Sequence, residues 1–350
     1  MNGARWQPAG LQARLSTRRQ HAQQGMAVIA VLVVVAIVAV LASTLMARQA
    51  TSIRAAQSEQ TRMQARWLLQ GEISRAQAVL LAEAKREPST RLDGLWHRTI
   101  SGEVLGRLEG GEVRLFSEIV DEQSKFNLRN LVSVDQIDPA EAETFLRLCS
   151  LVGVPQEQAQ RIARRVVVSL VEAERRVGAS GASSPAAIEE LKRARFAAQQ
   201  LGFGQQLPTR EQAPRLRTLD DMLMDEAIDS VVLERLRPYV TVLPARTRTN
   251  ANTARPEVLA ATIPGLQLDR ARALTQARDG GQWFLNRGDI FNRLQMQDTL
   301  SPSSLRVGVT SRWFRISSAL QAPQTILVVS ALLHDDKQTL PQVVWQREGV

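Results

Sequence analysis

The stretch QQGMAVIAVLVVVAIVAVLAS, residues 23 to 43, decides how the rest of the chain is interpreted. From position 26 to position 47 there are 22 residues without a charge. As a helix they would extend about 33 Å, enough to cross a hydrocarbon core of about 30 Å. The 25 residues before them hold four arginines and no acid, so this flank should stay in the cytoplasm while the rest of the chain is translocated.

Two kinds of processing fit this start. A cleaved secretory signal is one alternative, because Ala42 ends a possible cleavage site, but the apolar run exceeds the roughly 7 to 15 residues of an ordinary signal core. The junction of Gly25 and Met26 instead resembles the leader of type IV pilins and pseudopilins. That resemblance implies cleavage by a prepilin peptidase after Gly25 and N-methylation of Met26, which places Ala30 at the fifth mature position.

Major pilins and pseudopilins carry a glutamate at that fifth position, and Ala30 lacks its carboxylate. An unpaired carboxylate in lipid is costly. A subunit with no neighbour above it therefore has a physical reason to lose the glutamate.

Composition limits the chemistry. The chain has 350 residues and a formal net charge of +9, so an anionic partner such as nucleic acid or a lipid surface has to be considered. The single cysteine, Cys149, leaves no intramolecular disulfide and no cysteine-based metal site.

Beyond the apolar run the chain divides into helical and strand-like segments. Residues 48 to 86 lack proline and should continue the first helix until Glu87-Pro88 ends it. Period-two alternation predicts strands in residues 112 to 131, 303 to 336 and 343 to 345. Helices are expected in residues 138 to 174, around Gly153 and Pro155, and in residues 218 to 244 and 250 to 278, with a flexible loop at 178 to 185. Strands at both ends of a helical middle predict an α+β fold with a helical insertion.

Four segments carry a closer resemblance. They are LDGLW (92 to 96), IVDEQSKFNLRNL (119 to 131), FLRLCSLVGV (145 to 154) and LRPYVTVLPARTRTNANTARPEVLAA (236 to 261). Together with the leader they make the chain resemble, from Gly25 onward, the minor pseudopilin K family of type II secretion systems. The most distinctive family motif is the run with Asn250, Asn252 and Thr253.

The resemblance implies a pilin-like fold, with a long N-terminal helix on a small antiparallel sheet and a large inserted helical domain. The implied domains are a prepilin leader (1–25), the transmembrane part of the helix (26–47), and the periplasmic helix with the first strands of the head (48–134). Next come an inserted domain of two helical repeats, like SAM or helix-hairpin-helix domains (135–300), and the C-terminal strands of the head (301–350).

The resemblance also implies a role at the tip of the pseudopilus, in initiating its assembly and in protein export across the outer membrane. The implied location is the bacterial inner membrane, as a single-pass protein with a cytoplasmic N-terminus and a periplasmic bulk. Expected partners are minor pseudopilins I and J, the major pseudopilin and the prepilin peptidase, with the cargo or the secretin as further contacts.

Calcium has been associated with the helical domain of this family. Here residues 161 to 195 carry arginines and lysines where acids would be needed, and these repel a hard cation. We therefore expect no cofactor and no metal, and we do not assign calcium.

Enzymatic chemistry is not predicted. Outside the leader the only histidines are His97 and His334, and neither has a catalytic arrangement at a recognisable spacing. No glycine-rich phosphate loop occurs. The acids Asp220, Asp221, Asp225, Glu226 and Asp229 are interpreted as helix caps and a solvated face, with Thr218 and Asp221 as a capping box.

The alternative is a membrane-anchored helix-hairpin-helix protein that binds nucleic acid. Residues 250 to 278 resemble such a hairpin, whose Gly-x-Gly turn directs backbone amides at a phosphate. The turn here is Gly265-Leu266-Gln267, so a side chain crowds the position of the second glycine. We therefore interpret the hairpin as a packing motif and expect no nucleic acid.

Overall fold

The computed structural model describes residues 12–108, 111–133, 136–174, 185–203, 216–295, 305–323 and 325–349. It separates into two units, one up to Ala65 and one from Arg66 onward. The predicted flexible loop at 178 to 185 lies almost wholly outside the described residues, and so does the first part of the predicted leader, up to residue 11.

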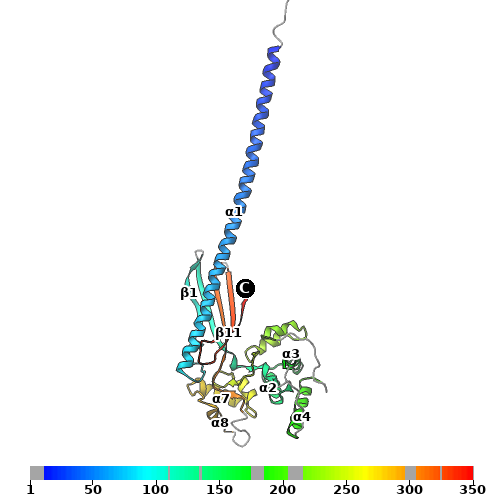
Figure 1. Ribbon diagram of the computed structural model, residues 1–350, viewed down its shortest axis with the longest axis vertical. Helices are drawn as coiled ribbons and strands as arrows, with labels where there is room; N and C mark the ends of the chain where they lie inside the picture. Colours follow the sequence, from blue (N-terminus) through cyan, green and yellow to red (C-terminus); the bar gives the residue numbers. More distant parts are fainter. Residues whose placement is uncertain are drawn as a thin grey trace, which may run out of the picture. The chain divides into compact units, whose positions relative to one another are not determined.

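One helix, α1 (Gln12–Arg86), begins the described chain (Figure 1). The predicted unbroken helix from position 26 to position 86 is confirmed. It ends directly before Glu87-Pro88, and it starts earlier than position 26, inside the predicted leader.

The second unit contains a five-stranded antiparallel sheet in the order β1-β2-β9-β10-β11. Two strands precede the helical middle of the chain and three follow it, so the predicted pairing across a helical insertion is confirmed. The strands are β1 (Ile100–Leu108), β2 (Gly111–Asp121), β9 (Trp313–Ala322), β10 (Thr325–His334) and β11 (Gln342–Gly349).

One face of this sheet is apolar and buried. In β2 every second residue is buried from Val113 to Ile119, and Ile119 lies opposite Ile316 of β9. The part of α1 from Arg66 onward covers the sheet with a buried stripe at heptad-like spacing, Leu69, Ile73, Ala76 and Leu80.

The strand prediction differed from the structure at two places. Strand β1 was not foreseen, because Gly102 and Gly106 interrupt its alternation and coincide with two shifts of register against β2. Strand β2 ends at Asp121, although the predicted strand continued to residue 131. The chain turns there because Asp121 accepts the backbone N–H of Gln123.

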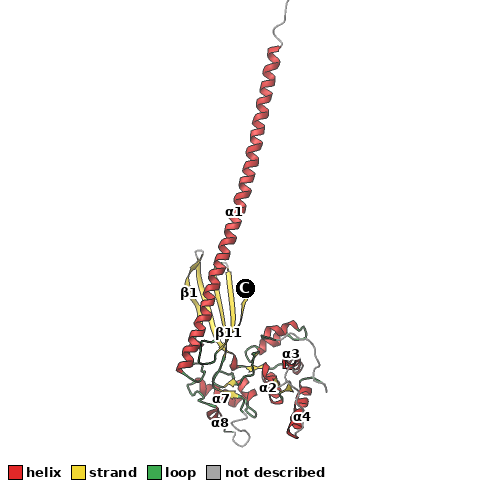
Figure 2. Cartoon of the chain, in the orientation of Figure 1, coloured by secondary structure: helices red, strands yellow, loops and turns green. Residues whose placement is uncertain are grey.

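The helical middle lies between β2 and β9 in the sequence. Figure 2 shows its helices in red. The two helices predicted around Gly153 and Pro155 are confirmed as α2 and α3. Its helices are α2 (Pro139–Leu151), α3 (Gln156–Glu174), α4 (Pro185–Gln200), α5 (Ser230–Leu236), α6 (Pro256–Thr262), α7 (Leu268–Asp279) and α8 (Arg287–Leu294). Short 3-10 turns are η1 (Leu95–His97), η2 (Glu122–Ser124), η3 (Leu128–Leu131) and η4 (Leu219–Met224). Short strands are β3 (Phe126–Asn127), β4 (Val132–Ser133), β5 (Gln136–Ile137), β6 (Val240–Thr241), β7 (Thr249–Asn250) and β8 (Val307–Gly308).

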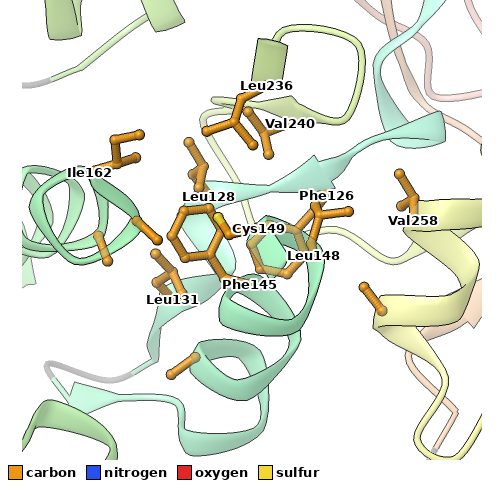
Figure 3. Packing of buried hydrophobic residues seen from close by; sticks show 14 of the residues in the cluster. Phe126, Leu128, Leu131, Phe145, Leu148, Cys149, Ile162, Leu236, Val240 and Val258 are labelled. Carbon is orange, nitrogen blue, oxygen red and sulfur yellow. The ribbon is translucent and has the colours of Figure 1, made fainter. Parts of the chain in front are cut away.

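An apolar core holds this helical part together (Figure 3). The ring of Phe126 stacks on the ring of Phe145 with centroids 5.9 Å apart. Leu148 and Cys149 of α2 and Ile162 of α3 are fully buried around the two rings. Burial raises the pKa of the Cys149 thiol to about 12, so this cysteine behaves as a small apolar side chain.

Candidate functional site

The apolar segment of α1 is the first candidate. From Val28 to Arg86 the helix contains a stretch with a mean hydropathy of 3.1, none of which is buried. It is the one described helix long and apolar enough to cross a membrane. Ala30 lies exposed within it, and Gly25 and Met26 lie on α1 upstream.

The LDGLW segment fixes the end of α1 to the sheet. Trp96 is 3% exposed, and its ring meets the ring of Phe314 of β9 edge to face at 5.4 Å. A Cβ on Gly94 would lie 2.6 Å from both Oε2 of Glu83 and Cδ1 of Trp96. Only glycine fits this close approach.

The two longer signature segments, far apart in the sequence, lie against each other. We call their contact the signature seam, made by residues 119 to 131 on one side and 240 to 253 on the other. Strand β3 pairs in parallel with β6, Phe126 opposite Val240. The seam joins the end of the sheet to the helical part.

Asp121, at the end of β2, is the centre of the seam and is 2% exposed. Its Oδ2 accepts hydrogen bonds from Thr253 Oγ1 at 2.5 Å, Ser311 Oγ at 2.6 Å and Asn250 Nδ2 at 3.2 Å. Burial raises the pKa of this carboxyl above its usual value, although the hydrogen bonds pull the pKa down. Asn250 and Thr253 of the predicted motif thus both donate hydrogen bonds to the same buried acid.

Asn252, the third residue of the motif, makes a separate contact. Its Nδ2 donates to the carbonyl of Phe284 at 2.9 Å, and its Oδ1 accepts the N–H of Phe284 at 2.8 Å. The buried Arg278 donates from Nη1 to the carbonyls of Ala251 and Ala254, at 2.9 and 2.7 Å. These side chains satisfy the backbone groups of an irregular buried loop.

Further asparagines hold the same loop from the other side of the seam. Asn130 bonds the backbone of Thr247 with both ends of its amide, donating to the carbonyl at 2.8 Å and accepting the N–H at 3.0 Å. Asn127 donates to the carbonyl of Ala245 at 2.8 Å.

A buried charged cluster completes the seam. Lys125 Nζ lies 3.1 Å and Arg315 Nε 2.8 Å from Oε1 of Glu122, and Thr241 Oγ1 donates to Oε2 at 2.5 Å. Burial by itself would raise the pKa of Glu122, but the two cations lower it to about 2. Glu122 is therefore ionised in the folded protein.

The seam is suited to holding two parts of a head together rather than to reaction chemistry. The polar groups of Asp121, Asn250 and Asn252 point at protein partners, and all three side chains are buried. Sequence reasoning placed Asn250, Asn252 and Thr253 in a motif, and it included Asp121, Glu122, Asn127 and Asn130 in a signature segment without assigning them a role. The available signal was the density of polar residues between an apolar strand and the next helix.

The acids of residues 220 to 229 act mainly as predicted. Asp221 accepts the N–H groups of Arg217 and Thr218, and Asp229 caps α5 by accepting the N–H of Val231. Asp220 is exposed and pairs with Arg237.

Within the described residues, no group of three or more His, Cys, Asp or Glu side chains is placed to hold a metal ion. Arginines of the helical part donate to loop carbonyls instead. Arg161 Nη1 reaches the carbonyl of Ala227 at 2.9 Å, Arg164 bonds the carbonyl of Gly202, and Arg235 Nη1 reaches that of Gly153 at 2.7 Å. Several arginines of the helical part therefore stabilise loops by donating hydrogen bonds to loop carbonyl groups.

The two histidines lie in different surroundings. His97 is exposed next to Trp96, and His334 is half-buried with its ring 4.5 Å from that of Trp313.

The helical hairpin packs against α2. Leu266 is fully buried in its turn, and Arg147 of α2 donates from Nη2 to the Leu266 carbonyl at 2.5 Å and from Nη1 to the Ile263 carbonyl at 3.4 Å. These contacts favour the packing interpretation of this hairpin.

Comparisons with known proteins agree on one protein family. Two family models described as type II secretion system (T2SS), protein K, match residues 124–245 and 249–310. The type II secretion system protein K of Pseudomonas aeruginosa is 28% identical over 306 residues, covering 85% of each chain. That of Pectobacterium carotovorum subsp. carotovorum is 24% identical over 349 residues, covering 93% of this chain and 97% of the relative.

A solved structure shares the fold. The crystal structure of the GspK-GspI-GspJ complex from the enterotoxigenic Escherichia coli type 2 secretion system contains a chain with a TM-score of 0.56 and 19% identity, covering 84% of this chain and 99% of that one. The long helix, the antiparallel sheet and the inserted helices agree with it, as the resemblance implied. The chain belongs to the type II secretion system protein K family of minor pseudopilins.

Proposed function

We propose that this protein is the minor pseudopilin at the tip of the type II secretion pseudopilus, where it helps to initiate assembly and export across the outer membrane. The observation that carries the tip placement is Ala30, an uncharged residue in the apolar segment of α1. A subunit with a neighbour above it gains from a carboxylate at this position, whereas a carboxylate without a partner is destabilising in lipid.

The helical part supports the same placement. It is inserted between β2 and β9, and its helices run from Pro139 to Leu294. An insertion of this size is difficult to accommodate along a helical shaft, and it can be accommodated at an end.

The proposed topology and processing follow the arginine-rich start of the chain. The N-terminus lies in the cytoplasm, α1 crosses the inner membrane, and the bulk lies in the periplasm. The prepilin peptidase cleaves after Gly25 and Met26 is methylated. The E. coli relative was solved together with GspI and GspJ. We extend that to this chain and propose minor pseudopilins I and J as its partners, with the major pseudopilin below them.

The tip placement is tested with Ala30→Glu, compared with Ala30→Ser as a small uncharged control. In a secretion-competent host lacking its own protein K, Ala30→Glu should reduce secretion at least several-fold, because its carboxylate meets no amine. Ala30→Ser should secrete normally. A chain with Ala30→Glu that assembles normally, or that labels evenly along the shaft, would contradict the tip placement.

Processing is tested by intact mass after coexpression with a prepilin peptidase. The chain should lose residues 1 to 25 and gain one methyl group. Gly25→Ile should block both changes, and Gly10→Ile in the same leader should block neither. A mature chain that starts near Ser43 would show a secretory signal instead and would exclude the pseudopilin leader.

A further inference from the structure

The two edges of the sheet are not equivalent. At the edge strand β1, register shifts fall between Ser101 and Glu103 and again between Val104 and Gly106, which bends the strand and interrupts its hydrogen-bonding edge. At the other edge, β11 has one register shift against β10, at Val344, and pairs without a shift from Trp345 to Gly349. Among the described residues no further strand pairs with the outer side of β11, so this run presents free backbone donors and acceptors.

Three residues of β11 line a cavity of about 750 Å³, which we call the β11 cleft. Residues of α3, of the chain around η4 and of positions 242 to 244 line it, together with Val344, Trp345 and Arg347 of β11. Val344 is 42% exposed. A smaller cavity of about 110 Å³ adjoins it and shares Trp345 and Arg347.

The β11 cleft is basic. The charged residues that line it within the described part of the chain are Arg129, Arg165, Arg217, Arg347 and Asp221. The single acid, Asp221, forms an ion pair with Arg347 at 3.1 Å and also accepts the backbone N–H groups of Arg217 and Thr218. The excess of positive charge favours an anionic occupant.

One of the residues that line the β11 cleft carries an unused hydrogen-bond donor. The indole Nε1 of Trp345 is buried and has no hydrogen-bond partner among the described residues. A buried N–H of this kind is satisfied in most folded proteins, so an acceptor is missing here. The Trp345 side chain itself is half-buried and packs against the apolar cluster that includes Leu332.

We infer that the β11 cleft binds an extended, acidic segment of a partner protein, which adds to β11 as a sixth strand of the sheet. Main-chain hydrogen bonds to β11 supply affinity in this mode, and alternate side chains supply specificity. Residues Trp345 and Arg347 point to the same face of the sheet because they are two apart. An acid at every second position of the added strand therefore lies beside Arg347 and Arg217, and a carboxylate or carbonyl oxygen can accept the indole N–H.

This inference does not depend on the tip placement, because it concerns binding by the isolated chain. The probe is a fluorescein-labelled octapeptide of alternating glutamate and valine, titrated by fluorescence anisotropy against the full chain in nonionic detergent. Comparison peptides are alternating lysine and valine, and the glutamate peptide N-methylated at its four central backbone nitrogens. We expect the first peptide to bind at least ten-fold more tightly than either comparison peptide.

Two charge reversals locate the binding. Arg217→Glu and Arg347→Glu should each weaken the glutamate peptide at least ten-fold. Arg107→Glu, the matched reversal on the opposite edge strand, should change its affinity less than two-fold. Circular dichroism melting identifies any variant that fails to fold, and the two comparison peptides test the inference on the unaltered protein.

Several results would overturn the inference. Absence of binding would do so, as would equal affinity for the lysine peptide. Equal affinity for the N-methylated peptide would exclude strand addition. A chain that dimerises through β11, with a dimer lost in Arg347→Glu and unaffected by the peptide, would assign the edge to a second copy of the chain instead.

Discussion

Two regions of this protein reverse the usual relation between polarity and burial. In the apolar segment of α1, residues such as Ile29 and Ile37 are 63% and 53% exposed. In the signature seam, Asp121, Asn250 and Asn252 are buried. The first region is explained by a lipid environment that the chain itself does not provide, and the second by partners that it does provide. The polarity of a residue therefore does not by itself show whether the residue is buried. The groups that surround the residue must be known as well.

The largest effect should come from removing the centre of the seam. Asp121→Ala removes the buried acceptor of Thr253 Oγ1 and Ser311 Oγ, and one of the three acceptors of Asn250 Nδ2. The free energy of unfolding should fall by about 3 to 5 kcal/mol, measured by chemical denaturation in detergent. Asp93→Ala, which removes an exposed acid paired with Arg91, is the control and should change stability by less than about 1 kcal/mol. Equal effects of the two variants would show that the seam contributes no more than a surface ion pair.

The seam should also set the acid stability. The pKa of Glu122 is about 2 in the folded protein, below its ordinary value of 4.5. Its contribution is therefore present above about pH 4.5 and is lost as the pH falls towards 2, by on the order of 3 kcal/mol in total. The raised pKa of Asp121 acts in the opposite direction, since burial favours its protonated form.

Comparing the wild type with Glu122→Gln isolates the contribution of Glu122 to stability in acid. Unfolding free energies measured from pH 7 to pH 3 should fall less steeply in the variant, which starts from a lower stability at pH 7. An identical slope in both proteins would contradict the assignment of acid sensitivity to Glu122.

The apolar segment can be tested by replacing one of its apolar residues with a charged one. Ile37→Asp puts a carboxylate near the middle of the uncharged segment and should raise the apparent cost of membrane insertion by about 2.5 to 3.5 kcal/mol. The measurement is the membrane-inserted fraction in an in vitro translocation assay, with Ile37→Leu as the uncharged control. Unchanged insertion of the aspartate variant would mean that residue 37 does not lie in the hydrocarbon core.

A smaller effect is expected at Asn252. In Asn252→Asp the Oδ1 acceptor for the N–H of Phe284 remains, but the donor to the Phe284 carbonyl is lost and a carboxylate faces that carbonyl. The free energy of unfolding should fall by about 2 kcal/mol, and hydrogen exchange at the Phe284 amide should accelerate accordingly. Asn286→Asp, at the solvent-facing cap of α8, keeps its function as an acceptor and should be nearly neutral.

The smallest effect should come from a polar contact outside both regions. Arg66→Ala removes an ion pair with Glu348 in which both side chains are about half exposed. A loss below about 1 kcal/mol is expected, and the loss should shrink further in high salt. A loss as large as that of Asp121→Ala would remove the distinction between buried and exposed polar groups on which the comparison depends.

Sequence reasoning succeeded where the signal was periodic or continuous. The uncharged run and the proline-free residues after it predicted the helix from position 26 to position 86, and Gly153 and Pro155 predicted the break between α2 and α3. It failed at β1, where Gly102 with a φ of +75° interrupts the alternation, and after Asp121, where side-chain hydrogen bonds turn the chain. Both failures occur where local backbone geometry overrides the hydrophobic pattern.

The sequence by itself determined the long apolar helix, the helical insertion between two groups of strands and the family to which the chain belongs. These features depend on composition and local spacing, which neighbouring residues set. Only the tertiary structure decided that residues 119 to 131 lie against residues 240 to 253, that Asp121 holds three distant donors, and that β11 has an open edge beside a basic cleft. Contacts of this kind join residues more than a hundred positions apart, and no local pattern records which side chain meets which.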